Sequence, residues 1–435
     1  MKKLIILFLI SASIFALSCD DSNYDYGALA IRAQSGSLFW KYTYSGTQTI
    51  ASEEEGGYYL SAAVSYNDDN SLFSKKGIAL IKFNSSRDVV WHKFYPITVD
   101  YNRVIIQKEN NNIYLCSSNN RNIQIIKHDI NGNIILKKSI GIEGIDRVES
   151  LESFIASDNG FLVGGNSNDT QNSNNNCSFI IKIDLNGNIL WSKKYNFEYL
   201  SSLAYKNNII YAVSKTSSIM TTDTEGNFIS AHNFNTTAQF ANTRIITTTD
   251  GIILGSKQDG NLLVMKILDD FSVAWQFTIG GQYDEGVTSL MKTSDNNLLI
   301  TSMTISYKGS SSANNTNNIW AIKCNITNGA VQWQKVYDLK GDSPSSTLEN
   351  EKGYLITGSY NNFNGENKAI MFQIDPQGDL PGYNGKFMIA DTPATQRSTS
   401  ISFSQGTTIT VDNFNISISE AEISGKEMKS DVSFL

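Results

Sequence analysis

The stretch that decides the fold is Ile180–Tyr195, which reads IIKIDLNGNILWSKKY. In its first half apolar and polar residues alternate, so Ile181 and Ile183 fall on one face, as in a half-buried β-strand. The Asp-Leu-Asn-Gly-Asn segment predicts a tight turn, because Asp and Asn bond their own backbone and Gly187 accepts a positive φ. A second strand follows, with Trp191 on the same face as the Lys and Tyr two and four residues later. The stretch therefore predicts a β-hairpin.

The same hairpin returns at intervals of roughly 40–58 residues, which is typical of a repeat architecture. The further copies begin at Ala79 (ALIKFNSSRDVVWHKFY), at Ala321 (AIKCNITNGAVQWQKVY) and, in weaker form, near Ala30, Ile125, Met220, Val264 and Ile370. Between hairpins lies a second pair of strands, whose later member begins with Gly in stretches such as GFLVGG and GYLITGSY. Four short strands per repeat, placed around a ring, form a β-propeller.

The GNILW and GAVQW segments each follow an apolar strand that ends in Asp or Asn. In this they resemble the tryptophan-bearing repeats of PQQ-like bacterial propellers. The resemblance covers about residues 28–380 and implies the fold, with the tryptophans holding neighbouring blades together. It implies no particular function, because many functions share this architecture.

The number of blades follows from counting repeats. Eight hairpins but only seven of these second strands are present, three of them in weaker forms that begin with Asn, so we expect an all-β single propeller of eight four-stranded blades, closed by its N- and C-terminal segments. Thr399–Ser404 and Thr407–Asp412 would supply the strands missing beside the first hairpin. Seven blades is the alternative, because Pro381 interrupts the last hairpin and Ser37–Tyr44 would fill its place. Eight is preferred because seven leaves Ala28–Arg32 without a partner.

The first residues predict export and a lipid anchor. Lys2 and Lys3 precede the apolar stretch Leu4–Phe15, which is the pattern of a secretory signal peptide. The following Ala-Leu-Ser-Cys resembles a bacterial lipobox, although Ala16 stands where that pattern prefers Leu. The resemblance implies lipidation of Cys19, and several acyl chains anchor a protein stably. The alternative is an ordinary signal peptide cleaved nearby.

These features divide the chain into four segments: a signal peptide (1–18), a lipidated tether (19–27), the propeller repeats (28–382) and a C-terminal tail (383–435) that contributes closing strands. The formal net charge is −7, and an acidic exterior argues against nucleic acid or anionic lipid as a partner. Cys116, Cys177 and Cys324 fall in predicted strands, which favours buried thiols; a Cys116–Cys177 disulfide is the alternative. We expect a monomer in the bacterial cell envelope.

Signals for catalysis are weak. His92, His128 and His232 lie at unrelated positions in the repeat and lack a metal-ligand spacing. Quinone-dependent dehydrogenases share the fold but carry adjacent cysteines, which this chain lacks. The turns that begin at Asp129 and Asp184 look like the start of a calcium loop, but neither has Glu at the twelfth position. We therefore assign no catalytic residue, cofactor or metal ligand.

Four connections between second and third strands are long: Tyr66–Lys76, Asn166–Cys177, Thr304–Asn317 and Asn361–Glu366. In a propeller they all emerge at one end of the ring, so variation gathers there, either as a binding face or as neutral insertions.

Two functions of different classes follow. The first is a membrane-anchored envelope scaffold that binds a protein or glycan with one face, similar in kind to the propeller lipoproteins that assist outer-membrane assembly. The second is an envelope enzyme, a polysaccharide lyase or hydrolase with its site in the central funnel. We prefer the scaffold. The enzyme predicts three or more titratable side chains that meet at the axis, whereas an apolar or Asn-lined axis contradicts it.

Overall fold

The computed structural model describes most of the chain between residues 43 and 420, and this part contains β-strands without a helix. No helix long and apolar enough to cross a membrane is therefore found in it. The described residues are 43–44, 49–52, 56–66, 75–86, 88–95, 103–119, 122–142, 147–168, 176–197, 199–215, 218–235, 241–307, 317–338, 342–361, 367–381, 388–391, 394, 396–405, 411–413 and 416–420.

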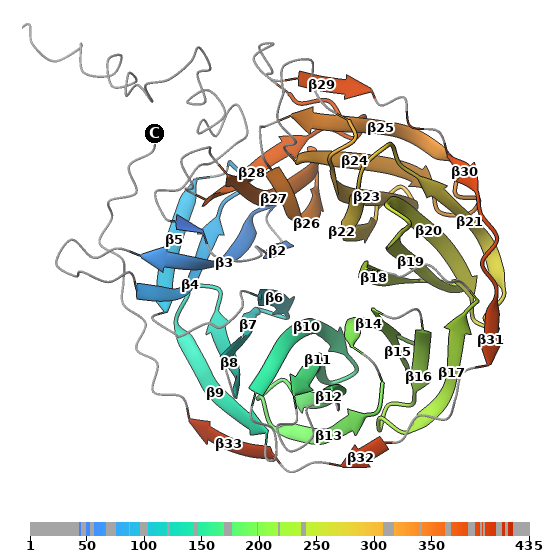
Figure 1. Ribbon diagram of the computed structural model, residues 1–435. Helices are drawn as coiled ribbons and strands as arrows, with labels where there is room; N and C mark the ends of the chain where they lie inside the picture. Colours follow the sequence, from blue (N-terminus) through green and yellow to red (C-terminus); the bar gives the residue numbers. More distant parts are fainter. Residues whose placement is uncertain are drawn as a thin grey trace, which may run out of the picture.

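The strands form seven antiparallel sheets, and each sheet is one blade of a propeller (Figure 1). Within a blade the chain moves from the innermost strand outward. Blades 1 to 4 consist of β2 (Thr49–Ser52), β3 (Tyr58–Tyr66), β4 (Lys75–Phe83), β5 (Val89–Tyr95); β6 (Val104–Glu109), β7 (Asn112–Asn119), β8 (Asn122–Asp129), β9 (Ile134–Ile142); β10 (Arg147–Ser157), β11 (Gly160–Asn168), β12 (Asn176–Asp184), β13 (Ile189–Tyr195); and β14 (Leu200–Lys206), β15 (Ile209–Ser214), β16 (Ser218–Thr222), β17 (Phe228–Phe234).

Blades 5 to 7 continue in the same way. They consist of β18 (Ala241–Thr248), β19 (Gly251–Gln258), β20 (Asn261–Leu268), β21 (Val273–Ile279); β22 (Glu285–Lys292), β23 (Asn297–Thr304), β24 (Asn318–Asn325), β25 (Val331–Asp338); and β26 (Asp342–Asn350), β27 (Gly353–Asn361), β28 (Asn367–Ile374). Neighbouring innermost strands contact one another around the whole ring, including β26 and β2, so blade 7 lies against blade 1.

The all-β propeller is confirmed, but eight blades is wrong and the alternative of seven is correct. The seven repeated second strands predicted the number, because each of them is the second strand of one blade. The first hairpin does not head a blade of its own: Thr43–Tyr44 forms β1, which pairs with β3 of blade 1 and contacts β28. Blade 7 shows three strands in its described residues, and Pro381, which cannot donate to a strand ladder, lies just beyond them. Ala28–Arg32 lies outside the described residues.

The C-terminal tail does not complete the first blade, so that prediction is also wrong. Its strands run backwards around the outside of the ring and add a fifth strand to blades 6, 5, 4, 3 and 2 in turn (Figure 1). They are β29 (Met388–Asp391), β30 (Arg397–Ser398), β31 (Phe403–Gln405), β32 (Val411–Asn413) and β33 (Ile416–Glu420). The tail advances seven or eight residues per blade, since Lys335, Phe277, His232, Lys193 and Lys138 pair with Asp391, Ser398, Gln405, Asn413 and Glu420. We call this segment the strap.

At the outer rim, blades 1, 3, 5 and 6 each hold the turn that follows the third strand of the next blade. Trp191 donates its indole N–H to Thr224 O at 2.8 Å, Lys193 Nζ lies 2.6 Å from Asn227 Oδ1, and Tyr195 donates to Gly226 O at 2.8 Å. The predicted shared face of these three side chains is therefore confirmed. The indoles of Trp91, Trp275 and Trp333 make the equivalent bond to Ile130 O, Ile326 O and Pro376 O. The repeated tryptophan thus joins blades, as expected.

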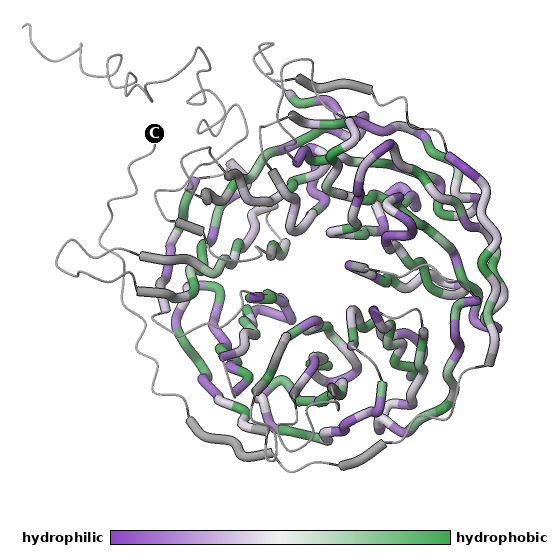
Figure 2. The backbone as a smooth tube through the Cα atoms, viewed as in Figure 1, coloured by the Kyte–Doolittle hydropathy of each residue, from purple (hydrophilic) through white to green (hydrophobic). Residues whose placement is uncertain are grey.

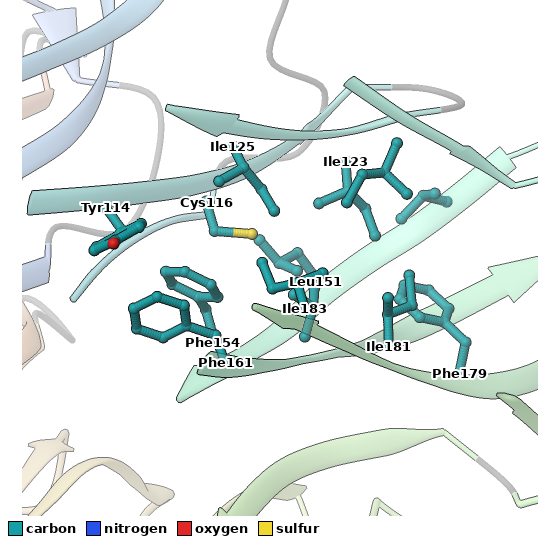
Figure 3. Packing of buried hydrophobic residues seen from close by; sticks show 13 residues of the cluster. Tyr114, Cys116, Ile123, Ile125, Leu151, Phe154, Phe161, Phe179, Ile181 and Ile183 are labelled. Atoms are coloured by element: carbon teal, nitrogen blue, oxygen red, sulfur yellow. The ribbon is translucent and has the colours of Figure 1, made fainter. Parts of the chain in front are cut away.

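Hydrophobic side chains fill the spaces between blades (Figure 3). Along the strands hydrophobic and hydrophilic residues alternate (Figure 2), which lets each sheet pack on its neighbours. Between blades 2 and 3, Cys116 lies beside Phe154 and Ile183 in one such cluster. Cys116, Cys177 and Cys324 are all buried as thiols, so the structure shows the buried thiols and not the Cys116–Cys177 disulfide. Burial raises the pKa of the Cys116 thiol, which keeps it neutral and unreactive.

Candidate functional site

The long connections lie at one end of the ring. They join β3 to β4, β11 to β12, β23 to β24 and β27 to β28, as predicted, and most of their residues lie outside the described part. Because consecutive strands of a meander alternate in direction, the connections between successive blades leave at this same end. We call it the loop end, and the end with the tight Asn-Gly turns the turn end.

Four charged side chains come together at the loop end, near the axis of the ring. Arg103 immediately precedes β6, Glu152 lies in β10, Lys215 follows β15 and Arg244 lies in β18. They come from blades 2, 3, 4 and 5, three of them from innermost strands or the residue just before one (Figure 1). We call Arg103, Glu152, Lys215 and Arg244 the axial cluster.

Glu152 is the centre of the axial cluster. Arg103 Nη1 lies 2.5 Å from Glu152 Oε2 and also donates to the main-chain oxygen of Glu152 at 3.0 Å. Lys215 Nζ lies 3.3 Å from the other carboxylate oxygen, Oε1. The side chain of Glu152 is 10% exposed, against 20% for Arg103 and 41% for Lys215. Both carboxylate oxygens are therefore held by cations, while solvent still reaches the two cations.

Arg244 is the member without a carboxylate of its own. Its Nη1 donates to Thr243 O at 3.0 Å and approaches Ser201 O, and in the described part of the chain it contacts no acidic side chain. Burial first, and then the charge of Arg103, lower the pKa of Arg244 to about 9, against the opposing effect of the Glu152 charge. A guanidinium in this position is a cation that lacks its counter-ion.

A β-bulge explains how Glu152 reaches the axis. In β10 the register shifts between Leu151 and Ser153, so Glu152 is the extra residue, and bulges of this kind re-aim a side chain. The innermost strands of blades 4, 6 and 7 have shifts at the matching place, and there the extra residues are Ser201, Thr288 and Ser345. At the place where blades 4, 6 and 7 carry a short hydroxyl side chain, blade 3 carries the carboxylate of Glu152.

A second buried carboxylate lies at the loop end between blades 5 and 6. Glu285 is fully buried at the start of β22, and its Oε1 accepts a hydrogen bond from Thr304 at 3.2 Å. Its Oε2 and the Oδ1 of Asn261 are buried without a hydrogen-bond partner. A Cβ placed on Gly280 would lie 2.9 Å from the first oxygen and 2.3 Å from the second, so both face the same space. Burial raises the pKa of Glu285.

The predicted candidates fall elsewhere. The three histidines do not come together: His128 is buried against Tyr95, with 2.5 Å between Nε2 and the phenol oxygen, and burial lowers its pKa to about 4. His232 stacks on Phe271 at the rim, and His92 lies in β5. Across the described residues, no three His, Cys, Asp or Glu side chains form a metal-ligand set. Cys19 lies outside the described residues.

The Asp-x-Asn-Gly turns use their carboxylates internally. Asp184 Oδ1 accepts hydrogen bonds from the main-chain N–H groups of Asn186 and Asn188 at 2.8 and 2.7 Å, and its Oδ2 accepts one from the Asn188 side chain. These bonds lower the pKa of Asp184 against the opposing effect of burial. The hairpin interpretation of these turns is thus confirmed by their bonding.

The solved structures that resemble this chain do so at low identity. BamB from Moraxella catarrhalis matches with a TM-score of 0.36 and 12% identity, over 78% of this chain and 97% of that one. A protein of unknown function from Dyadobacter fermentans gives 0.43 and 10%, over 78% and 99%, and the computationally designed Ika8 protein gives 0.41 and 12%, over 76% and 98%. No protein-family model and no curated protein matches the chain. The likeness extends to the β-propeller fold alone.

Proposed function

We propose that this protein is a lipid-anchored scaffold of the bacterial cell envelope that holds a partner protein at the loop end of its propeller. The Ala-Leu-Ser-Cys sequence at residues 16–19 supports the anchor. The axial cluster carries the binding role. It places three cations and one carboxylate at the end of an otherwise acidic molecule, at positions where the repeat needs no charge.

The surroundings of the axial cluster favour binding over catalysis. Arg103 and Lys215 occupy both oxygens of Glu152, so this carboxylate is not free to move a proton. Arg244 donates to main-chain oxygens and stays charged at neutral pH. Such a set recognises a negative group and fixes its position, which is what a docking site needs.

An enzyme is the second candidate, because four titratable side chains do meet near the axis. Eliminative cleavage of an acidic polysaccharide needs cations against the substrate carboxylate and a base, and the Lys215 ammonium lies 5.6 Å from the centre of the Tyr199 ring. Incubation with acidic polysaccharides, followed by the ultraviolet absorbance of unsaturated products, tests this. If the wild type releases unsaturated products and Tyr199→Phe does not, the protein is an enzyme and the scaffold proposal is contradicted.

Anchoring is tested with Cys19→Ala in the native host. We expect the wild-type protein in the membrane fraction with a processed N-terminus, and the variant unprocessed or released. Equal processing and fractionation of the two proteins contradicts the anchor.

Partner binding is tested by crosslinking in isolated envelopes, with the double variant Arg103→Gln/Lys215→Gln. The control is Lys206→Gln/Arg397→Gln, which removes the same charge at the end of β14 and on the strap. We expect one crosslinked partner that the wild type and the control retain and the cluster variant loses. Equal crosslinking of all three proteins contradicts the binding role.

A further inference from the structure

We propose that Arg244, assisted by Arg103 and Lys215, binds a carboxylate group from an acidic segment of the partner protein. This inference rests on the proposed function for the existence of a protein partner. It adds the chemical class of the group that is bound and the residue that receives it.

The charges of the axial cluster do not balance. Glu152 is the acidic member, and both of its oxygens are taken by Arg103 and Lys215. Among the described residues, Arg244 remains with hydrogen bonds to main-chain oxygens, which satisfy a donor but do not neutralise the charge. In a chain with a net charge of −7, a local excess of positive charge next to a half-buried guanidinium is a feature that a bound anion would complete.

The axial cluster itself shows which anion fits. A carboxylate already lies between an Arg and a Lys from neighbouring blades, at 2.5 and 3.3 Å. A second carboxylate on Arg244 would repeat this arrangement, because a guanidinium presents two parallel N–H groups that match the two oxygens of a carboxylate. Lys215 is 41% exposed and Arg103 is 20% exposed, so an incoming group meets cations that are still in contact with water.

A protein segment is favoured over an acidic glycan. Sugar rings pack their apolar faces against aromatic rings, and Tyr199 is the aromatic side chain that the structure places beside a member of the axial cluster. The Lys215 ammonium lies over that ring, 5.6 Å from its centre, and the main-chain N–H of Lys215 donates to Tyr199 O. The ring is thus engaged with the cluster and is not presented as a platform, whereas an Asp or Glu side chain needs only the guanidinium.

Binding would also relieve an unfavourable feature of the free protein. Arg244 is half-buried, and a cation held partly out of water without an anion costs free energy; the lowered pKa of Arg244 expresses this cost. An arriving carboxylate removes it, so the complex should melt at a higher temperature than the free protein. The attraction between charges should weaken as salt is added.

The test is a titration of the purified full-length protein, in detergent at low salt, with a synthetic oligoglutamate peptide. Oligoglutamine, oligogalacturonate and inorganic phosphate are the comparison probes. The variants are Arg244→Gln and the control Arg397→Gln, which makes the same substitution on the exposed strand β30. We expect oligoglutamate to bind the wild type and the control, and the Kd to rise roughly tenfold to hundredfold in Arg244→Gln.

A second variant, Glu152→Gln, separates binding from structure. It removes the internal carboxylate that competes for Arg103 and Lys215, so we expect it to bind oligoglutamate more tightly than the wild type. A role in folding alone predicts weaker binding instead. Circular dichroism and melting curves of each variant without ligand show whether the fold is kept.

The remaining outcomes each overturn the proposal. Unchanged binding in Arg244→Gln, or none to the wild type, removes the site. Binding of oligogalacturonate but not oligoglutamate would assign the site to a glycan. Binding of phosphate alone would contradict the proposal that the bound group is a carboxylate. Because this titration uses pure protein, its failure leaves the anchoring and crosslinking results intact, and their failure does not affect it.

Discussion

The rim and the axis of this propeller are built on different rules. At the rim the same contact recurs from blade to blade, with an indole that donates to the next blade's turn at four junctions, at 2.8–3.2 Å. At the axis, by contrast, Glu152 stands where three other blades place Ser201, Thr288 and Ser345. Repetition therefore marks the residues that hold the ring together, and departure from repetition marks the residues to which we assign the proposed binding role.

The largest expected effect is at the rim. Trp191→Ala removes the bond to Thr224 O and the ring that covers Gly226, and should lower the free energy of unfolding by about 2–3 kcal/mol. The measurement is urea unfolding followed by circular dichroism. Leu190→Ala is the matched control, because this neighbouring side chain is 53% exposed and should change stability little. Equal losses in the two variants would show that the recurring tryptophan does not join the blades.

A smaller effect is expected from the turn that receives this tryptophan. Gly226 has a φ of 73°, and a Cβ on it would lie 2.9 Å from the Trp191 ring. Gly226→Ala should therefore cost about 1–2 kcal/mol in the same urea experiment. Gly286→Ala, on an innermost strand, is the control, since the nearest atom that its Cβ would meet is 3.4 Å away. In the double variant Gly226→Ala/Trp191→Ala, the loss of stability should be smaller than the sum of the two single losses, because the added Cβ no longer meets the Trp191 ring. Losses that simply add would contradict this contact.

Two buried carboxylates of the loop end extend the comparison. Glu152 has cationic partners, while Glu285 Oε2 has none, and burial raises the pKa of Glu285. Glu285→Gln provides an amide donor toward Asn261 Oδ1, so it should stabilise the protein at pH 7 by about 1 kcal/mol.

The gain from Glu285→Gln should depend on pH. Below the ordinary carboxyl pKa, Glu285 is neutral in both the folded and the unfolded protein, and the variant has no advantage. As the pH rises through the raised pKa of the folded state, the unfolded chain ionises first and the wild type loses stability. Melting temperatures of both proteins between pH 4 and pH 8 measure this, and curves that stay parallel would contradict the raised pKa.

The smallest expected effect on stability is at the axis. Arg244→Gln removes a half-buried charge that has no carboxylate partner among the described residues, so the free energy of unfolding should change by no more than about 0.5 kcal/mol, in either direction. Urea unfolding of this variant beside Arg397→Gln provides the measurement. A loss above about 2 kcal/mol would mean that Arg244 holds blades together and that the distinction between rim and axis fails there.

The features that the sequence predicted correctly are those that depend on residues close together in the chain. The alternation of Ile181 and Ile183, the Asp184 turn and the shared face of Trp191 and Tyr195 depend on neighbouring residues, and all appear in the structure. The long second-to-third-strand connections were also predictable, because they interrupt a regular pattern. The seven repeated second strands indicated seven blades, but the additional hairpin at the start of the chain led to the expectation of eight.

The strap and the axial cluster, which the sequence did not predict, depend on contacts between residues far apart in the chain. The strap pairs residues 416–420 with residues 138–142, and its short strands carry no signal of which blade they join. The axial cluster depends on the bulge at Glu152, which shifts one side chain by one position in register. Comparing aligned repeats position by position would have singled out Glu152, but Lys215 and Arg103 lie in connections that do not repeat.

The strap also bears on how the molecule is assembled. Its strands come after all seven blades in the chain, yet they pair with the outer strands of blades 6, 5, 4, 3 and 2. Until the strap is made, those five outer strands present unpaired N–H and C=O groups, and open strand edges invite pairing with other chains. The strap thus covers the open strand edges of blades that come earlier in the chain. A propeller that lacks these strands would be a folded ring whose outer strands are unpaired, and it would be prone to associate with other copies through those edges.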